Sequence, residues 1–68
     1  MIQLTINGKS RDFDVAMLSV AHLVANLSLE GKRLAIERNG EIVPRSQFAE
    51  TMLADGDKLE IVGAVGGG

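Results

Sequence analysis

The residues of this sequence that most suggest chemistry are the three glycines at its end, Gly66, Gly67 and Gly68. Glycines at a free chain end add nothing to a core and lose the most conformational entropy when held. We therefore expect residues 66–68 to form a flexible tail on a folded domain of residues 1–65. Such a tail can enter a narrow cleft of a partner and present its terminal carboxylate to a reactive centre. The alternative is a frayed end or a cloning remnant without function.

Other residue types that often carry chemistry are absent or isolated. The sequence has no cysteine, which excludes a disulfide, a thiolate metal site and a thiol nucleophile. The only histidine, His22, is without a partner of the kind that ligands and catalytic bases need, and we expect it on the surface. Asp55-Gly56-Asp57 predicts a plain turn, because the further oxygen ligands of a calcium loop are missing. We expect no metal site, no intrinsic cofactor and no catalytic residue.

Composition argues against nucleic acid and membranes as partners. The 68 residues carry a formal net charge of −2, and their seven lysines and arginines are scattered among nine acidic residues. Phe13 and Phe48 are the only aromatic residues, so stacking platforms for bases are missing. No apolar run approaches the roughly 20 residues that span a bilayer, and the first residues lack the pattern of a signal peptide. We expect a cytoplasmic protein.

The first elements that must position the tail form a hairpin. Hydrophobic and polar residues alternate over residues 2–6, and Asn7-Gly8 then supplies the two positive φ angles of a type I′ turn. The returning strand is predicted over about residues 9–15, with Phe13 and Val15 on the face that joins the core.

A helix follows the hairpin. Hydrophobic residues recur at offsets of three, four and seven between residues 20 and 27, which predicts one apolar stripe. The stripe consists of Val20, Leu23, Val24 and Leu27. Ser19 is the expected N-cap, and a helix capped by Asp14 and beginning near Val15 is the alternative. Gly31 fits the chain reversal after the helix.

A second hairpin and a final strand complete the predicted domain. Residues 34–38 form a strand, Asn39-Gly40 a second tight turn, and residues 41–43 its partner, which Pro44 ends. After an irregular stretch, residues 58–65 form the last strand. The predicted order is that of an α+β domain, in which one helix covers one face of a sheet.

Within the last strand the hydrophobic residues divide between two faces. Leu59 and Ile61 are predicted to face the core, whereas Val62 and Ala64 face outward. Val62 and Ala64 are therefore a candidate apolar patch for a partner, with Arg38 and Arg45 as charges at its rim.

Three segments together resemble the bacterial ThiS family: residues 37–45, residues 53–62 and residues 65–68. The resemblance covers the whole chain, although ubiquitin and the molybdopterin-synthase small subunit share the closing glycine pair. It implies a β-grasp fold, in which the helix crosses one face of a mixed sheet whose first and last strands lie parallel at the centre. Residues 16–18 depart from the family pattern, because relatives often have a turn with proline or glycine there.

The resemblance also implies a function, that of a sulfur carrier in thiamin biosynthesis, which serves as a cosubstrate and is not itself an enzyme. A ThiF-like enzyme that uses ATP and magnesium would adenylate the carboxylate of Gly68. A cysteine desulfurase or sulfurtransferase would supply sulfur as a persulfide, and a ThiG-like thiazole synthase would consume the resulting thiocarboxylate. Gly66 and Gly67 would form the slim neck that these partners recognise.

Three alternatives remain at this level. The chain resembles, less closely, the sulfur carrier of another pathway, the molybdopterin-synthase small subunit type. A protein modifier of the ubiquitin type would use the same glycine end to form an isopeptide bond. A plain β-grasp interaction domain would have an incidental glycine tail.

Overall fold

The computed structural model describes residues 1–63, and residues 64–68 lie outside the described part. The elements, in chain order, are β1 (Ile2–Ile6), β2 (Lys9–Phe13), β3 (Leu18–Ser19), α1 (Val20–Asn26), β4 (Leu34–Arg38), β5 (Glu41–Val43), the 3₁₀ helix η1 (Arg45–Gln47), β6 (Met52–Leu53) and β7 (Lys58–Gly63).

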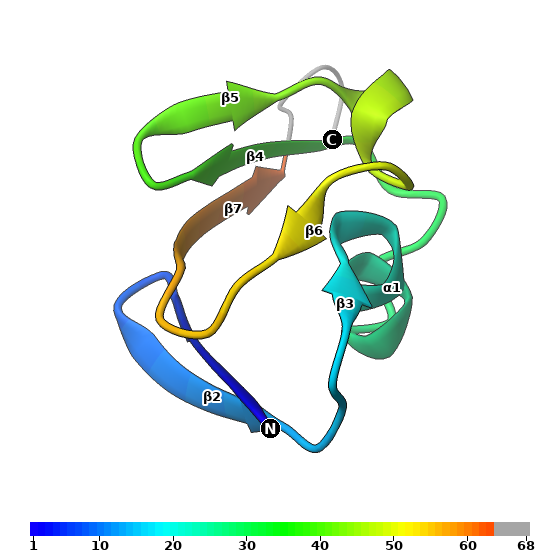
Figure 1. The fold of residues 1–68 in the computed structure, drawn as a ribbon. Coiled ribbons are helices and arrows are strands. Elements are labelled where there is room, and N and C mark those ends of the chain that lie inside the picture. Colours follow the sequence, from blue (N-terminus) through cyan, green and yellow to red (C-terminus); the bar gives the residue numbers. More distant parts are fainter. Residues whose placement is uncertain (64–68) are drawn as a thin grey trace.

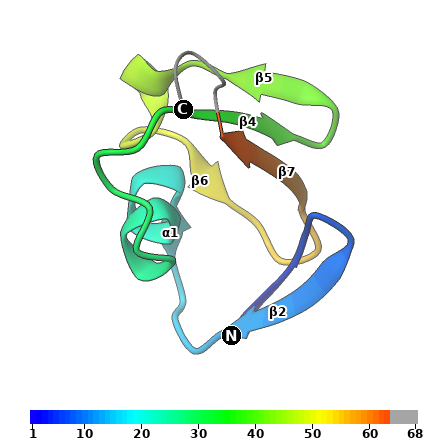
Figure 2. The same cartoon turned by 180° about the vertical axis from the view of Figure 1, so that it is seen from behind.

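Five of the strands form one mixed sheet in the order β2-β1-β7-β4-β5. β1 and β7 run parallel, with Thr5 opposite Lys58 and Ile6 opposite Leu59, and the other neighbours are antiparallel. The helix α1 lies on one side of this sheet, and β3 and β6 form a separate two-stranded sheet next to it (Figures 1 and 2). The first and last strands are therefore parallel neighbours inside a mixed sheet under one helix, which confirms the expected β-grasp fold.

Both Asn-Gly pairs form the turns that the sequence predicts. Asn7 and Gly8 have φ angles of 51° and 83°, and Asn39 and Gly40 have φ angles of 51° and 89°. Two successive positive φ angles are the requirement of a type I′ turn, whose twist matches that of the strands it joins. These two turns fix the register of the β1–β2 and β4–β5 hairpins.

The core lies between α1 and the sheet face turned toward it. Alternate residues of the strands reach this core, as the two-residue period of a strand requires. Leu4, Leu23, Ile36 and Leu59 are its most deeply buried leucine and isoleucine side chains, each exposing at most 1% of its surface. The inward positions predicted for Leu59 and Ile61 are confirmed.

The structure corrects two details of the first half of the chain. The strand after the first turn ends at Phe13, and Val15, expected on the core face, exposes 41% of its surface. The helix begins at Val20 with Ser19 as its N-cap, so the alternative start near Val15 is wrong. The reason is that Leu18 and Ser19 pair with Leu53 and Met52 and are therefore extended.

Candidate functional site

The glycine tail itself, Gly66, Gly67 and Gly68, lies outside the described residues, as does Ala64. The structure does describe the place from which the chain enters it. Gly63 is the last residue of β7 and lies opposite Leu34 of β4. β7 is the central strand of the sheet, with β1 and β4 as its neighbours, and the chain runs from its end toward the tail.

Val62 lies on the sheet face away from α1, as predicted, and exposes 56% of its surface. Its cross-strand partner on β4 is Ala35, which is also exposed. Ile42 of β5 faces the same way from a position diagonal to Ala35 and exposes 64% of its surface. We call Val62, Ala35 and Ile42 the outer apolar patch.

Acidic side chains border this patch. Glu37 of β4 lies between its neighbours Ile42 and Glu60 in the sheet, directly opposite both. Two carboxylates in opposite positions repel each other, and water screens that repulsion only in part. A partner that covers the patch and brings positive charges to Glu37 and Glu60 removes this repulsion.

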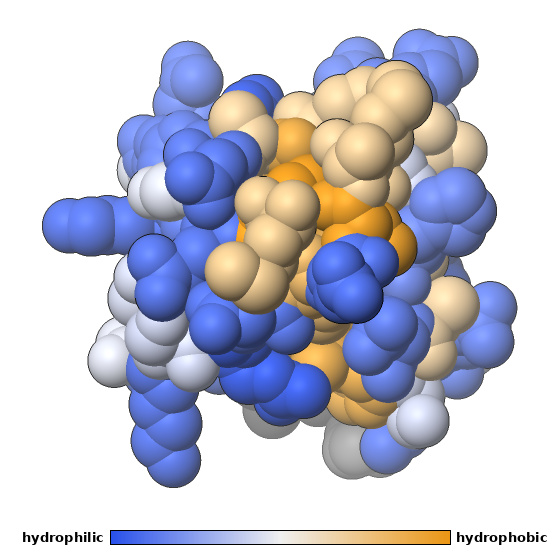
Figure 3. Space-filling view, turned by 60° about the horizontal axis from the view of Figure 1, so that its bottom comes forward, coloured by the Kyte–Doolittle hydropathy of each residue, from blue (hydrophilic) through white to orange (hydrophobic). Residues whose placement is uncertain are grey.

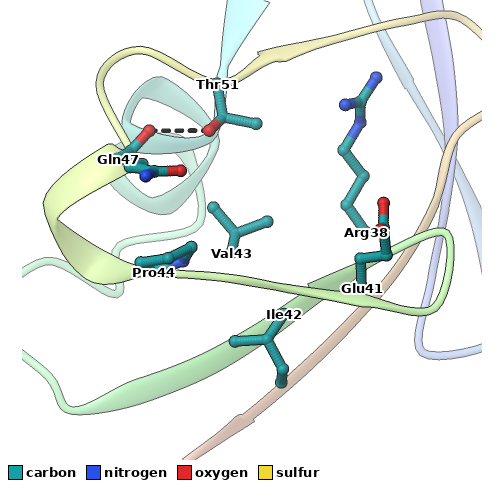
Figure 4. A pocket seen from close by; sticks show the side chains of 7 residues that line it. All are labelled: Arg38, Glu41, Ile42, Val43, Pro44, Gln47 and Thr51. Atoms are coloured by element: carbon teal, nitrogen blue, oxygen red, sulfur yellow. Dashed lines mark hydrogen bonds between the residues drawn. The ribbon is translucent and has the colours of Figure 1, made fainter.

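The structure does not bring Arg38 together with Val62. Arg38 has the strand parity of Ile36, so its side chain is on the α1 side of the sheet, where its Nε donates to Oδ2 of Asp57 at 2.8 Å. Figure 4 shows Arg38 and Ile42 pointing to opposite sides of the hairpin. Arg45 is exposed at the start of η1, after the chain has left β5.

Asp57 is a buried polar residue that holds several elements together. It exposes 7% of its surface and accepts hydrogen bonds from the Ala54 N–H at 2.8 Å, from Asn39 Nδ2 at 3.0 Å and from Arg38 Nε. Burial by itself raises the pKa of Asp57, but the three hydrogen bonds and the Arg38 charge outweigh it and lower the pKa below the ordinary value. Asp57 thereby joins the β4–β5 turn to the loop before β7.

Comparison with known proteins adds to this geometry. A family model described as "ThiS family" matches residues 4–68. The chain belongs to the ThiS family.

Curated relatives and solved structures agree with this membership. The sulfur carrier protein ThiS of Bacillus subtilis is 38% identical over 65 residues, covering 96% of this chain and 98% of that protein. A crystal structure of the thiamine biosynthesis protein ThiS of Geobacter metallireducens superimposes with a TM-score of 0.86 at 35% identity, covering 98% of this chain and all of that one.

A third relative is much longer than this chain. A thiazole synthase of Paramagnetospirillum magneticum is 46% identical over 67 residues, which are 98% of this chain but 20% of that protein. The chain therefore spans about one fifth of this relative and nearly the whole of the Bacillus protein.

Two of the three segments that carry the resemblance to ThiS meet in space, and the third, residues 65–68, lies outside the described residues. Residues 37–45 supply Arg38 and Asn39, residues 53–62 supply Ala54 and Asp57, and these four make the hydrogen bonds around the Asp57 carboxylate. From the sequence, Asp57 is predicted only as part of a plain turn, without this role. Its position between a turn and a strand was the available signal, but its partners lie on another hairpin.

A hollow of about 210 Å³ lies beside the second hairpin, between the end of β5 and the segment after η1 (Figure 4). It is lined by Arg38, Glu41, Ile42, Val43, Pro44, Gln47 and Thr51. Thr51 Oγ1 donates to the Gln47 carbonyl at 2.8 Å at one side of it. The hollow is smaller than the roughly 300–1,000 Å³ of typical ligand pockets.

A second apolar area lies elsewhere on the surface. Figure 3 shows apolar side chains gathered on the side that carries the N-terminus, surrounded by polar ones. Among residues 1–63, the exposed large hydrophobic side chains outside the outer apolar patch are Met1, Val15, Met17 and Met52. None of them was singled out from the sequence as a contact residue.

His22 is exposed on α1, as expected. Over residues 1–63 there is no group of three or more histidine, aspartate or glutamate side chains arranged to hold a metal ion. In the same part of the chain, α1 is seven residues long and no helix has the length and hydropathy to cross a membrane.

Proposed function

We propose that this protein is a sulfur carrier of thiamin biosynthesis and that the carboxylate of Gly68 is the atom group that carries the sulfur. The observation that supports this most directly is that the ThiS family match runs through residue 68 and therefore includes the glycine tail. The name of the Bacillus subtilis relative, "Sulfur carrier protein ThiS", supports the same assignment.

The chemistry requires activation, because a carboxylate is a poor electrophile. A ThiF-like enzyme that uses ATP and magnesium joins a Gly68 oxygen to the α-phosphate and releases pyrophosphate, giving an acyl-adenylate with a good leaving group. A persulfide from a cysteine desulfurase or sulfurtransferase then displaces AMP at the acyl carbon. Reduction of the resulting acyl disulfide by a thiol leaves the thiocarboxylate.

In this scheme the domain is a cosubstrate and its partners are the catalysts. A ThiG-like thiazole synthase takes sulfur from the thiocarboxylate and returns the carboxylate. The relative in which a domain like this one is a fifth of a thiazole synthase supports that pairing. The tail glycines Gly66 and Gly67 admit Gly68 to a cleft that excludes water from the labile adenylate.

The outer apolar patch is the proposed docking surface for these partners. Val62 is one residue from the end of the described part of β7, so a partner that grips Val62, Ala35 and Ile42 also controls the start of the tail. Arg45 and Ala64 remain proposed contacts, whereas Arg38 supports the domain through Asp57. The acidic border of Glu37 and Glu60 favours a partner surface with positive charges.

The decisive test is the intact mass of the protein after incubation with ATP, magnesium, a ThiF-like enzyme and a persulfide source. We expect the mass increase of one oxygen replaced by one sulfur, and no change in a control that lacks Gly68. Transfer of that sulfur to a ThiG-like thiazole synthase would assign the pathway.

The other assignments give different results in the same experiment. Transfer only to a molybdopterin-synthase large subunit would move the protein to that pathway. An isopeptide conjugate with a lysine of another protein would identify a modifier. If the same enzyme activates the Bacillus subtilis relative but this protein shows no mass change, the protein is a plain interaction domain.

A further inference from the structure

The end of β7 is supported unequally on its two sides. On one side β4 pairs with β7 from Leu59 to Gly63. On the other side β1 pairs with β7 only at Lys58 and Leu59, because β1 ends at Ile6 and the chain turns back at Asn7-Gly8. Beyond Leu59, no strand of the described residues lies on the β1 side of β7.

Asn7 takes the place of the missing strand. Its backbone N–H donates to the Leu59 carbonyl at 2.9 Å, which ends the β1–β7 ladder. Its side chain then continues the ladder, because Nδ2 donates to the Ile61 carbonyl at 2.9 Å and Oδ1 accepts from the Ile61 N–H at 2.8 Å. Both backbone groups of Ile61 on that side are thereby satisfied.

We infer that Asn7 is a positioning residue: its side chain holds the end of β7 in the sheet and so sets the direction in which the chain leaves toward Gly68. This inference rests on the proposed function. A strand end held on both sides fixes the direction of the chain at the end of β7, whereas a strand end held on one side samples several directions. A partner that accepts one orientation binds more weakly when that orientation is only partly populated.

Asn39 provides a matched control within the same chain. It also occupies the first central position of a type I′ turn with a φ of 51°, and its side chain also makes two hydrogen bonds. Its Oδ1 accepts from the Lys58 N–H at 2.9 Å and its Nδ2 donates to Asp57. These bonds lie at the beginning of β7, at the far end of the strand from the tail.

The test compares Asn7→Gly with Asn39→Gly. Glycine adopts positive φ without strain, so both variants keep the turn and lose only the side-chain bonds. Both variants are studied below their thermal transitions, where they are folded. The KM and kcat of adenylation by the ThiF-like enzyme are measured, together with the rates of native-state amide exchange. We expect Asn7→Gly to raise the KM of the carrier about tenfold with kcat within about twofold, and Asn39→Gly to change neither.

Amide exchange shows where the strand is loosened, and the change in KM at nearly constant kcat is the readout that a purely stabilising role would not produce. Asn7→Gly should speed exchange at Ile61 far more than at Leu59, whereas Asn39→Gly should speed it at Lys58. Asn7→Asp keeps an acceptor for the Ile61 N–H and should recover part of the KM.

The outcomes separate this inference from the proposed function. Equal KM values for the two glycine variants, with the wild type activated normally, would overturn the positioning role and leave the carrier function intact. Unchanged exchange at Ile61 in Asn7→Gly would overturn it as well. A wild type that the enzyme does not adenylate would refute the proposed function and, with it, any role of Asn7 in activation.

Discussion

Single polar side chains hold this domain together where its short strands cannot. Asp57 accepts from a backbone N–H, an amide and a guanidinium, and Asp55 Oδ1 accepts from the Gln3 N–H at 2.7 Å. The loop before β7 is therefore attached to β1 on one side and to the β4–β5 turn on the other. A buried carboxylate with its hydrogen bonds satisfied stabilises such a junction, and leaving its partners unpaired costs much of that stability.

At this scale we predict that Asp57→Asn lowers the free energy of unfolding by about 2 kcal/mol at pH 7. The change removes the charge and turns an acceptor into a donor facing other donors. Asp55→Asn, at an exposed position, is the control. It should change the free energy of unfolding by less than about 0.5 kcal/mol, because the asparagine keeps an acceptor oxygen for the Gln3 N–H. Urea denaturation followed by circular dichroism measures both, since the chain has no tryptophan or tyrosine for fluorescence.

The lowered pKa of Asp57 makes the difference in stability between wild type and Asp57→Asn depend on pH. The carboxyl binds a proton less readily in the folded state than in the unfolded state, so protonation favours unfolding. The stabilisation by Asp57 is fully present above the unfolded pKa of about 3.9 and is lost as the pH falls toward the folded pKa. The difference between wild type and Asp57→Asn should therefore shrink below about pH 4. A difference that stays constant to pH 2 would show that the charge contributes nothing.

Among the elements, α1 depends on the segment that follows β5. A helix leaves its first N–H groups without partners inside the helix. Here the Val20 N–H donates to the Thr51 carbonyl at 2.9 Å, the Ala21 N–H to the Phe48 carbonyl at 3.0 Å, and the His22 N–H to Ser19 Oγ at 3.1 Å. The start of the seven-residue helix is thus capped both by Ser19 and by the carbonyls of Phe48 and Thr51. The pairing of β3 with β6 brings the two segments together.

We predict that Ser19→Ala lowers the free energy of unfolding by about 1 kcal/mol, because the partly buried His22 N–H then loses its acceptor. For a domain of this size that corresponds to a fall in Tm of about 4–8 °C. Ser19→Thr keeps the hydroxyl and should stay close to wild type. Equal thermal transitions for wild type and Ser19→Ala would show that water replaces the cap.

The molecule as a whole has one sheet face covered by α1 and one that no described element covers. On the uncovered face the outer apolar patch includes Val62 of β7, the strand that leads to the tail. A single partner can therefore hold the sheet and the tail at the same time. The exposed hydrophobic side chains of the patch are stabilised by such contact and contribute little to folding.

We predict that Val62→Asp raises the KM for adenylation by about tenfold and lowers the free energy of unfolding by less than about 1 kcal/mol. Ser10→Asp is the matched control, because it places the same charge on an exposed strand position of the same face, opposite Thr5 and outside the patch. Circular dichroism checks the fold and single-turnover adenylation checks binding. Equal KM values for the two variants would remove the patch from the proposed docking surface.

Local patterns in the sequence were sufficient for the hairpins, the helix stripe and the last strand. Asn7-Gly8 and Asn39-Gly40 determine their turns through positive φ angles alone, and alternation places Leu59 inside and Val62 outside. The order of these elements, with the resemblance to ThiS, was enough for the β-grasp fold. All of these depend on residues close in the chain, where period and turn chemistry act directly.

The tertiary structure alone decided which polar groups meet. Asp57 finds Arg38 and Asn39 nearly twenty residues away, Asn7 finds Ile61 across 54 residues, and β3 exists only because β6 returns beside it. It also separated Arg38 from Val62: Arg38 lies opposite the inward-facing Leu59, whereas Val62 lies opposite the outward-facing Ala35. A sequence pattern specifies the period of each element, whereas the partners of a buried carboxylate or amide depend on how distant elements pack.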